Sequence, residues 1–142
     1  MARFSWTDDL YTGSTLIDSD HRKLIGLVNA LFETMEDGQD SARMRPALNA
    51  LLTYTAEHFD REQAEMARIQ YVAALAHESE HHRLLQQLAG LKQMLDAGGR
   101  LNLPAIADFL SRWLRDHILT ADMKLAAVLT QQRSAAPVAP EH

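Results

Sequence analysis

Residues 113–122 read WLRDHILTAD and place His117 and Asp122 five residues apart within an apolar helical pattern. On a regular α-helix such residues lie about 140° from each other. Both side chains can therefore face one interior only if the helix breaks or bulges between them. We predict this interruption, with Thr120 capping a short final helix over about 121–131.

Apolar residues recur at three- and four-residue steps in four segments, as they do on amphipathic helices. Helices are predicted over about 19–37, after the polar turn 39–41 as far as about 70, over 71–97 and from 103 onward. Asp18 should cap the first helix, and Gly98 with Gly99 should end the third, whose apolar stripe begins at Val72. Pro46 should lie near the first turn of the second helix, and Pro104 at the start of the fourth. No segment shows the two-residue alternation of a strand, so we predict an all-α, antiparallel up-down-up-down four-helix bundle.

The two ends of the chain differ from this pattern. Residues 1–17 lack clear periodicity but contain Phe4, Trp6 and Tyr11, which predicts an N-terminal extended arm lying on the domain. Residues 134–142 are small and interrupted by proline, which predicts a disordered tail. The bundle and its arm then form one domain over 1–133.

Composition excludes several classes of protein. The net charge is -5, and the 14 Lys and Arg residues are scattered singly, which argues against nucleic acid as a partner. The chain has no cysteine, so disulfides, iron–sulfur clusters and thiolate zinc sites are excluded. No segment has the length and apolarity of a signal peptide or a membrane span, so we expect a cytoplasmic protein.

Histidines and carboxylates stand on the apolar stripes of all four helices. His58 with Glu62 and His77 with His81 are pairs four residues apart, which share one face of a helix. Burial of such groups without partners would cost several kcal/mol in total, and a metal would offset that cost. The full candidate set is His21, His58, Glu62, His77, His81, His117 and Asp122. Seven ligands exceed the six positions of one octahedral ion, and imidazole-rich ligation favours iron, so two iron ions are predicted.

In these residues the chain resembles the hemerythrin family, most closely the single-domain bacteriohemerythrins. The resemblance rests on IDSDH at 17–21, HFDRE at 58–62 followed by Met66, HESEH at 77–81, and residues 113–122, and it covers about residues 4–130. It implies one iron held by His77, His81 and His117. It implies a second iron held by His21 and His58, with Glu62, Asp122 and an oxo or hydroxo group bridging the two.

The resemblance also implies a function, which is reversible dioxygen binding at this non-haem di-iron centre for storage, delivery or sensing. Dioxygen would occupy an open position on the second iron. The pocket flanking that position would be formed by Leu24, Phe59, Met66, Trp113, Leu114 and Ile118. We expect a monomer that is not an enzyme, with an oxygen-consuming protein as its partner.

Three other interpretations compete with this one. HESEH at 77–81 also fits the zinc metallopeptidase motif, with Glu78 as general base, although Leu84 and Gln87 replace the glycine and third histidine of the extended motif. The chain could instead be a metal-free helical interaction module. A di-iron site could also serve an oxidase, a peroxidase or an iron store.

Several polar residues beside the candidate ligands are predicted to lie at the surface. His82 follows His81 and is about 100° round the helix from it. Four acidic residues directly precede ligands but are out of phase with them, so they are expected to be solvated charges. They are Asp20, Glu57, Glu80 and Asp116.

Overall fold

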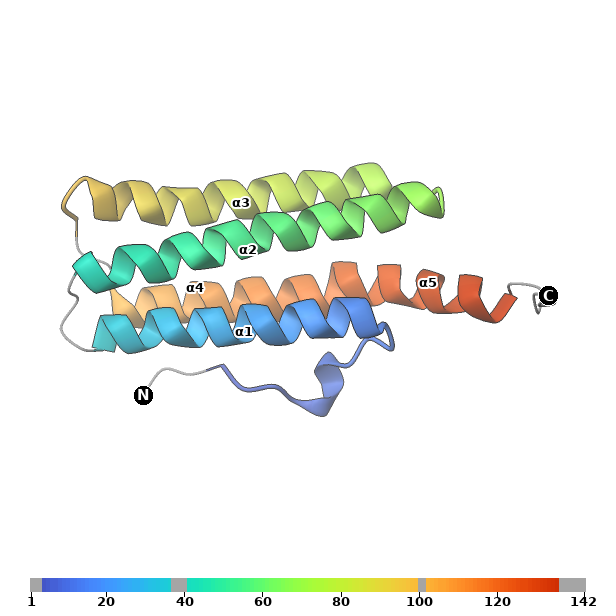
Figure 1. Cartoon of the computed structure of the whole chain (residues 1–142), viewed down its shortest axis with the longest axis horizontal. Coiled ribbons are helices and arrows are strands. Elements are labelled where there is room, and N and C mark those ends of the chain that lie inside the picture. The colour runs from blue at the N-terminus through green and yellow to red at the C-terminus, as the bar shows by residue number, and fades with distance from the viewer. Residues whose placement is uncertain (1–3, 37–40, 100–101, 136–142) are drawn as a thin grey trace.

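A computed structural model describes residues 4–36, 41–99 and 102–135, and it confirms the antiparallel four-helix bundle (Figure 1). The bundle has four helical segments that run along its length, called rods below. Three of them are single helices, namely α1 (Thr15–Glu36), α2 (Ser41–Arg68) and α3 (Ala74–Asp96). The fourth consists of α4 (Leu103–Asp116), the π-helical segment η2 (His117–Asp122) and α5 (Met123–Ala135). The described residues contain no strand, and none of their helices is both long and apolar enough to cross a membrane.

Helix α1 begins four residues earlier than predicted, and its cap is Ser14 rather than Asp18. Ser14 Oγ accepts a hydrogen bond from the N–H of Ile17, the third residue of the helix, at 3.3 Å. Asp18 Oδ1 instead accepts hydrogen bonds from the backbone N and the Oγ1 of Thr12. Gly13, at φ 90°, permits the bend between these residues. The predicted arm therefore ends at Ser14 and not at residue 17.

The arm runs beside α1 and is attached along its length (Figure 1). It includes a short 3-10 helix, η1 (Asp8–Leu10). Phe4 is buried, and both its backbone N–H and its carbonyl bond to the Asn29 side chain, at 2.8 and 2.9 Å. The Arg22 guanidinium lies over the rings of Trp6 and Tyr11 and bonds to the Tyr11 hydroxyl. The prediction of an arm lying on the domain agrees with these contacts.

The α2–α3 turn starts the third helix at Ala74 rather than at 71. Gln70 adopts a left-handed φ of 54°, which lets the N–H of Tyr71 bond to the carbonyl of Met66 at 2.9 Å and closes α2. The chain then reverses through two more residues before α3. Val72, predicted on the apolar stripe of that helix, lies outside it and is fully exposed.

The other helix ends follow their sequence signals more closely. Gly98, at φ 84°, and Gly99 end α3, and the Gly99 N–H bonds to Met94 O at 2.9 Å. The Asn102 side chain accepts from the Ala105 N–H and caps α4, with Pro104 in its first turn. Pro46 lies inside α2, one turn beyond the start of that helix.

The fourth rod bulges where it was predicted to, but it does not stop. Through η2 the hydrogen bonds span five residues, as shown by the Met123 N–H donating to Ile118 O. The predicted cap at Thr120 is wrong, because its Oγ1 donates back to the Asp116 carbonyl and stays within the helix. Helix α5 then reaches Ala135, beyond the predicted limits of 131 for the helix and 133 for the domain. Residues 136–142 of the predicted tail lie outside the described part of the chain.

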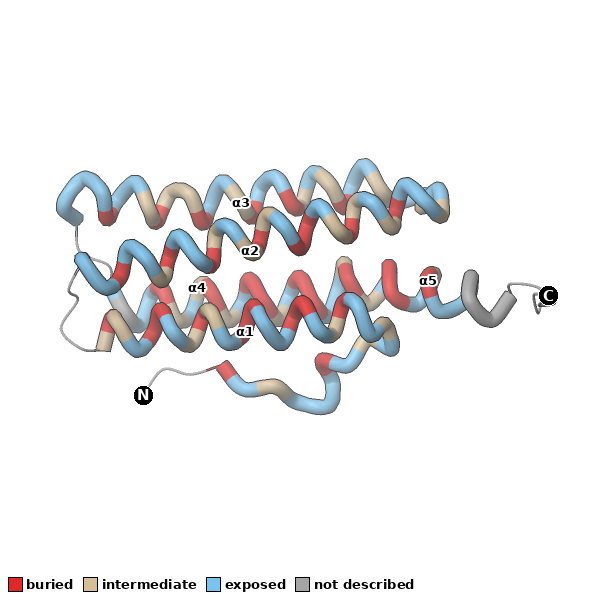
Figure 2. Tube along the Cα trace, in the orientation of Figure 1, coloured by how far each residue is buried: buried red, intermediate tan, exposed pale blue. Residues whose placement is uncertain are grey.

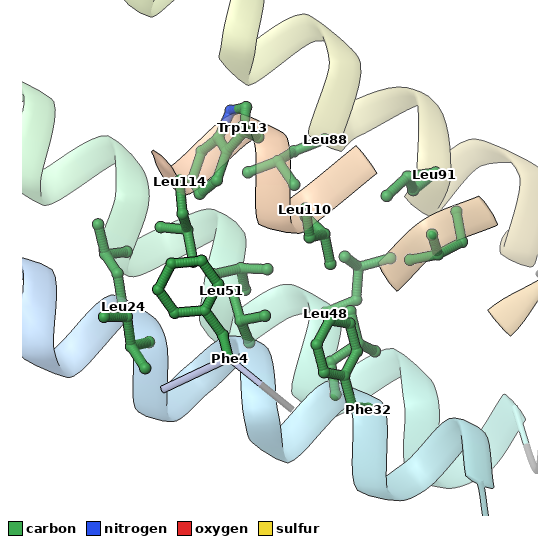
Figure 3. Packing of buried hydrophobic residues seen from close by; sticks show 14 of the residues in the cluster. Phe4, Leu24, Phe32, Leu48, Leu51, Leu88, Leu91, Leu110, Trp113 and Leu114 are labelled. Carbon is green, nitrogen blue, oxygen red and sulfur yellow. The ribbon is translucent and has the colours of Figure 1, made fainter. Parts of the chain in front are cut away.

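Two apolar clusters fill the bundle, on opposite sides of the candidate ligands. Buried residues lie on the inward faces of the helices (Figure 2), and Figure 3 shows the packing of the larger cluster around Phe4, Phe32 and Leu110. The smaller cluster comprises Ile17, Met66, Leu125, Ala126 and Leu129. On α1, His21 falls between Ile17 of the smaller cluster and Leu24 of the larger one. The site is therefore a polar layer between two dry ones.

Ser14→Ala should lower the free energy of unfolding by about 1 kcal/mol, since the N–H of Ile17 loses its capping oxygen. Chemical denaturation of the metal-free protein measures this change. Ser19→Ala, at an exposed position inside α1, is the control and should change stability by less than about 0.5 kcal/mol. Equal effects of the two substitutions would refute the cap.

Candidate metal centre

The structure brings all seven candidate ligands into one buried layer. The histidines come from every rod, and each of the seven side chains is at most 5% exposed. Helix α1 provides His21, α2 provides His58 and Glu62, α3 provides His77 and His81, and the π-helical segment provides His117 and Asp122. The π hydrogen bonds bring the last two residues into phase, which a regular helix would not do.

Glu62 lies between histidines of two different helices. Its Oε2 is 3.0 Å from His58 Nε2, and its Oε1 is 3.0 Å from His77 Nε2 and 3.1 Å from His81 Nε2. Each oxygen of one carboxylate therefore faces a different part of the cluster. This is the arrangement expected of a carboxylate shared by two ions.

Asp122 occupies the same kind of position. Its Oδ2 lies 2.5 Å from His21 Nε2, 3.0 Å from His117 Nε2 and 3.6 Å from His58 Nε2. Its Oδ1 lies 3.2 Å from His77 Nε2. In all five histidines, Nε2 is the nitrogen that faces the carboxylates.

The donor atoms form two overlapping groups in which all atoms lie within 4.8 Å of one another. One group is His21, His58, Glu62, His117 and Asp122, and the other is Glu62, His77, His81, His117 and Asp122. The two carboxylates and His117 belong to both groups. The geometry therefore divides the donors into two overlapping groups and does not assign His117 to one of them alone.

Unpartnered polar atoms indicate that the donor set suits metal ions. The Nε2 atoms of His58, His81 and His117, together with Glu62 Oε2 and Asp122 Oδ1, are buried without a hydrogen-bond partner. Leaving such groups unpaired costs about 1–3 kcal/mol each. Imidazole and carboxylate are good ligands for iron, and divalent ions between these atoms would satisfy them together.

Burial and mutual contact change the pKa values of the ligands. For Glu62, burial and the Asp122 charge act to raise the pKa, but the close contacts with His58, His77 and His81 lower it to about 2. Burial acts to lower the pKa of His77, but bonds to Asp122 and Glu62 raise it to about 9. Burial opposes the same effect on His58, whose carboxylate partners raise its pKa well above the usual range. The metal-free site therefore holds protons that a metal must displace.

Asp20 contradicts the prediction that it is a solvated charge, because it is only 5% exposed. Its Oδ2 accepts from His58 Nδ1 at 2.8 Å and from Arg61 Nε at 2.9 Å. Its Oδ1 accepts from Arg61 Nη2 at 2.9 Å and from the Tyr54 hydroxyl at 2.7 Å. These partners hold the pKa of Asp20 well below its usual range, against the effect of burial.

A sequence signal for this network was present. Tyr54, His58 and Arg61 are spaced by four and three residues, which places them on one face of α2. Their polar groups required a buried acceptor from another helix, and sequence periodicity does not show which one. The other three acidic residues predicted as solvated are exposed or half-buried, and His82 is exposed as expected.

The predicted dioxygen-pocket residues fall into two places. Leu24, Phe59, Trp113, Leu114 and Ile118 are buried together in the larger apolar cluster. Met66 instead belongs to the smaller cluster, on the other side of the ligand layer. The structure therefore groups five of the six residues and separates Met66 from them.

Two surface hollows reach the ligand layer. A hollow of about 350 Å³ has His77 in its wall with Tyr71, Thr120 and Lys124. A second, of about 280 Å³, has His117 and Trp113 in its wall. Each hollow therefore borders the ligand layer at one histidine.

The geometry also bears on the metallopeptidase interpretation. Glu78, the general base in that interpretation, belongs to neither group of clustered donor atoms among the described residues. His77 and His81 instead face Glu62, which the peptidase motif does not include. The two histidines of the HESEH segment therefore belong to the seven-residue set of candidate ligands.

Fold and site together define a four-helix metal-binding protein with a buried, histidine-rich centre. Residues 12–129 match the family described as Hemerythrin HHE cation binding domain. The chain belongs to the hemerythrin family, and its cluster is accordingly a non-haem iron site.

Known relatives agree with this assignment. A bacteriohemerythrin of Pseudomonas paraeruginosa is 30% identical over 122 residues, which span 86% of this chain and 78% of the relative. A hemerythrin-like protein of Naegleria gruberi is 30% identical over 126 residues, spanning 89% of this chain and 93% of the relative. A crystal structure of wild-type hemerythrin superposes with a TM-score of 0.82 at 29% identity, covering 89% of this chain and 98% of that one.

Glu62→Ala should abolish stoichiometric metal binding, because one substitution removes a carboxylate that faces both groups of histidines. The metal-loaded protein should lose about 3 kcal/mol of stabilisation. Elemental analysis and thermal unfolding measure the two effects. Glu57→Ala, an exposed site on the same helix, should retain the metal, and retention of both ions by Glu62→Ala would disprove the bridging position.

Loading the metal-free protein with Zn²⁺ at pH 7 should release about two protons per chain, mainly from His58 and His77. Both histidines have a raised pKa and are protonated at this pH before loading. Apparent affinity should accordingly fall as the pH is lowered. Calorimetry in buffers of different ionisation enthalpy counts the protons. His82→Ala should leave the number unchanged, and loading without proton release would contradict the prediction.

Proposed function

We propose that this chain binds dioxygen reversibly at a centre of two iron ions, with the seven clustered side chains as ligands. The observation that carries the proposal is the convergence of five buried Nε2 atoms on two carboxylates. The names of its bacteriohemerythrin relatives support the same conclusion. Two iron ions, when bound, would supply the electrons that hold dioxygen.

The side chains would divide as the family resemblance implies. His77, His81 and His117 would hold one ion, and His21 and His58 the other. Glu62 and Asp122 would span both ions, each with one oxygen toward either side. The ion with fewer protein ligands would have room for an external molecule.

Apolar side chains keep bulk water from the ligands. The Phe59 ring stacks on His81, with ring centroids 3.7 Å apart and planes at 4° to each other. The same ring lies 5.3 Å from that of His117. Leu24, Leu114 and Ile118, each about 1% exposed or less, belong to the same cluster. The predicted pocket residues are apolar apart from the buried indole N–H of Trp113, which is a very weak acid. Such an environment favours release of intact dioxygen over its reduction.

The donor set also separates this function from its nearest alternative. Oxidases and iron stores of the ferritin-like type use four Glu and two His, a more anionic set than five imidazoles and two carboxylates. Fewer anionic ligands stabilise the oxidised ions less, which favours reversible binding. Oxidase, peroxidase or storage activity is the second candidate. A monomeric state, a cytoplasmic location and an oxygen-consuming partner stay predictions.

Metal analysis and optical spectra test the proposal. The purified protein should hold about two irons per chain, since seven ligands exceed the positions of one octahedral ion. After anaerobic reduction, air should produce an absorption band that disappears again when oxygen is removed. One zinc per chain with no spectral change would refute the proposal.

Repeated oxygenation cycles distinguish binding from turnover. A carrier should return the same band over successive cycles without consuming reductant. Steady consumption of reductant and oxygen would assign the centre to an oxidase or peroxidase instead. The zinc-loaded protein serves as control and should show no band.

A further inference from the structure

Asp20 is a buried carboxylate that contacts one of the candidate ligands without being a ligand itself. It follows Ser19 on α1 and precedes His21, but its side chain points to α2 and contacts His58 there. Its two oxygens accept four hydrogen bonds, all from side chains of α2. The carboxylate thereby joins two helices directly behind one ligand.

The contact determines how His58 faces the metal. An ionised carboxylate only accepts hydrogen bonds, so the Nδ1 of His58, 2.8 Å from Asp20 Oδ2, must carry the proton of that bond. The lone pair for metal binding is then on Nε2, the atom that faces Glu62 and Asp122. Hydrogen bonding to a carboxylate also makes the imidazole a stronger electron donor.

Arg61 and Tyr54 hold the carboxylate in this position. The Arg61 guanidinium binds both Asp20 oxygens, each at 2.9 Å, in the paired geometry that fixes a carboxylate plane. The Tyr54 hydroxyl adds a third donor at 2.7 Å, and its ring lies 5.1 Å beneath the guanidinium. Arg61 is 37% exposed and therefore only partly offsets the Asp20 charge at His58.

This support is not shared equally among the ligands. The Nδ1 atoms of His21, His81 and His117 are buried and have no hydrogen-bond partner within the described part of the chain. His58 therefore receives an anionic partner that these three lack. The additional carboxylate therefore supports the group of donors that contains His21 and His58. The proposed function places dioxygen at the metal position formed by this group.

We propose that Asp20 is a positioning residue that fixes His58 through Nδ1 and makes the His21–His58 metal position the more electron-rich of the two. Arg61 and Tyr54 set the strength of this effect, because each withdraws charge from the same carboxylate. The assignment of dioxygen to this position rests on the proposed function. The effect on metal affinity does not.

Asp20→Asn keeps the size of the side chain and removes its charge. Zn²⁺ affinity of the weaker site, measured by competition with a chelator, should fall about tenfold to a hundredfold. Asp18→Asn is the matched control, since Asp18 is a hydrogen-bonded acid on α1 that contacts Thr12 and no ligand. It should change affinity less than about twofold. Equal affinities for Asp20→Asn and the unmodified protein would overturn the proposal.

The midpoint potential of the iron-loaded protein gives a readout that loss of structure would not mimic. Asp20→Asn removes negative charge behind His58 and should shift the potential positive. Arg61→Gln removes the opposing positive charge and should shift it negative, with Tyr54→Phe giving a smaller shift in the same negative direction. Shifts of one sign in all three variants would show a merely structural role and overturn the proposal.

The affinity and potential measurements still test the role of Asp20 if one variant does not fold, or if the protein does not bind dioxygen reversibly. Should Asp20→Asn not fold, Arg61→Gln and Tyr54→Phe still have to move the potential negative, and no shift in either would refute the proposal. Should the iron protein fail to bind oxygen reversibly, the proposed function falls. The Zn²⁺ measurement then decides the role of Asp20 alone.

Discussion

The structure depends on the requirement that seven buried polar side chains from four rods meet in one layer. Unsatisfied, these groups would oppose folding, because each buried donor or acceptor without a partner costs free energy. The apolar clusters on both sides leave the ligands one another, a metal and, for His58, the Asp20 carboxylate as partners. The spacing of the ligands along each helix, their burial and their capacity to bind metal therefore depend on one another. The π-helical segment is the local distortion that brings both His117 and Asp122 into the layer.

The contacts within the ligand layer are not symmetric. Glu62 and Asp122 are each shared between histidines of several helices, so neither group of clustered donor atoms is independent of the other. Asp20, held by Arg61 and Tyr54, supports only His58. A bundle of four similar rods can in this way provide two unequal positions. Inequality of this kind is what a centre needs if one ion is to bind an external molecule while the other is enclosed by protein.

Most of the fold could be predicted because its signals are local. Gly98 ends α3 and Asn102 begins α4 through backbone geometry and capping that act within a few residues. Other ends depended on choices that local patterns leave open. Ser14 rather than Asp18 caps α1 because Thr12 holds the Asp18 carboxylate. Val72 has an apolar side chain at helical spacing, yet the left-handed Gln70 places it in the turn outside α3.

The sequence by itself determined the bundle, the seven candidate ligands and the need for an irregular step between His117 and Asp122, because helical phase follows directly from residue number. Tertiary structure decided what depends on contacts between rods. It chose a continuous π-helical bulge over a break at Thr120, buried Asp20 behind His58, and separated Met66 from the other predicted pocket residues. Phase along one helix says which side chains face inward, but only packing decides which of them meet.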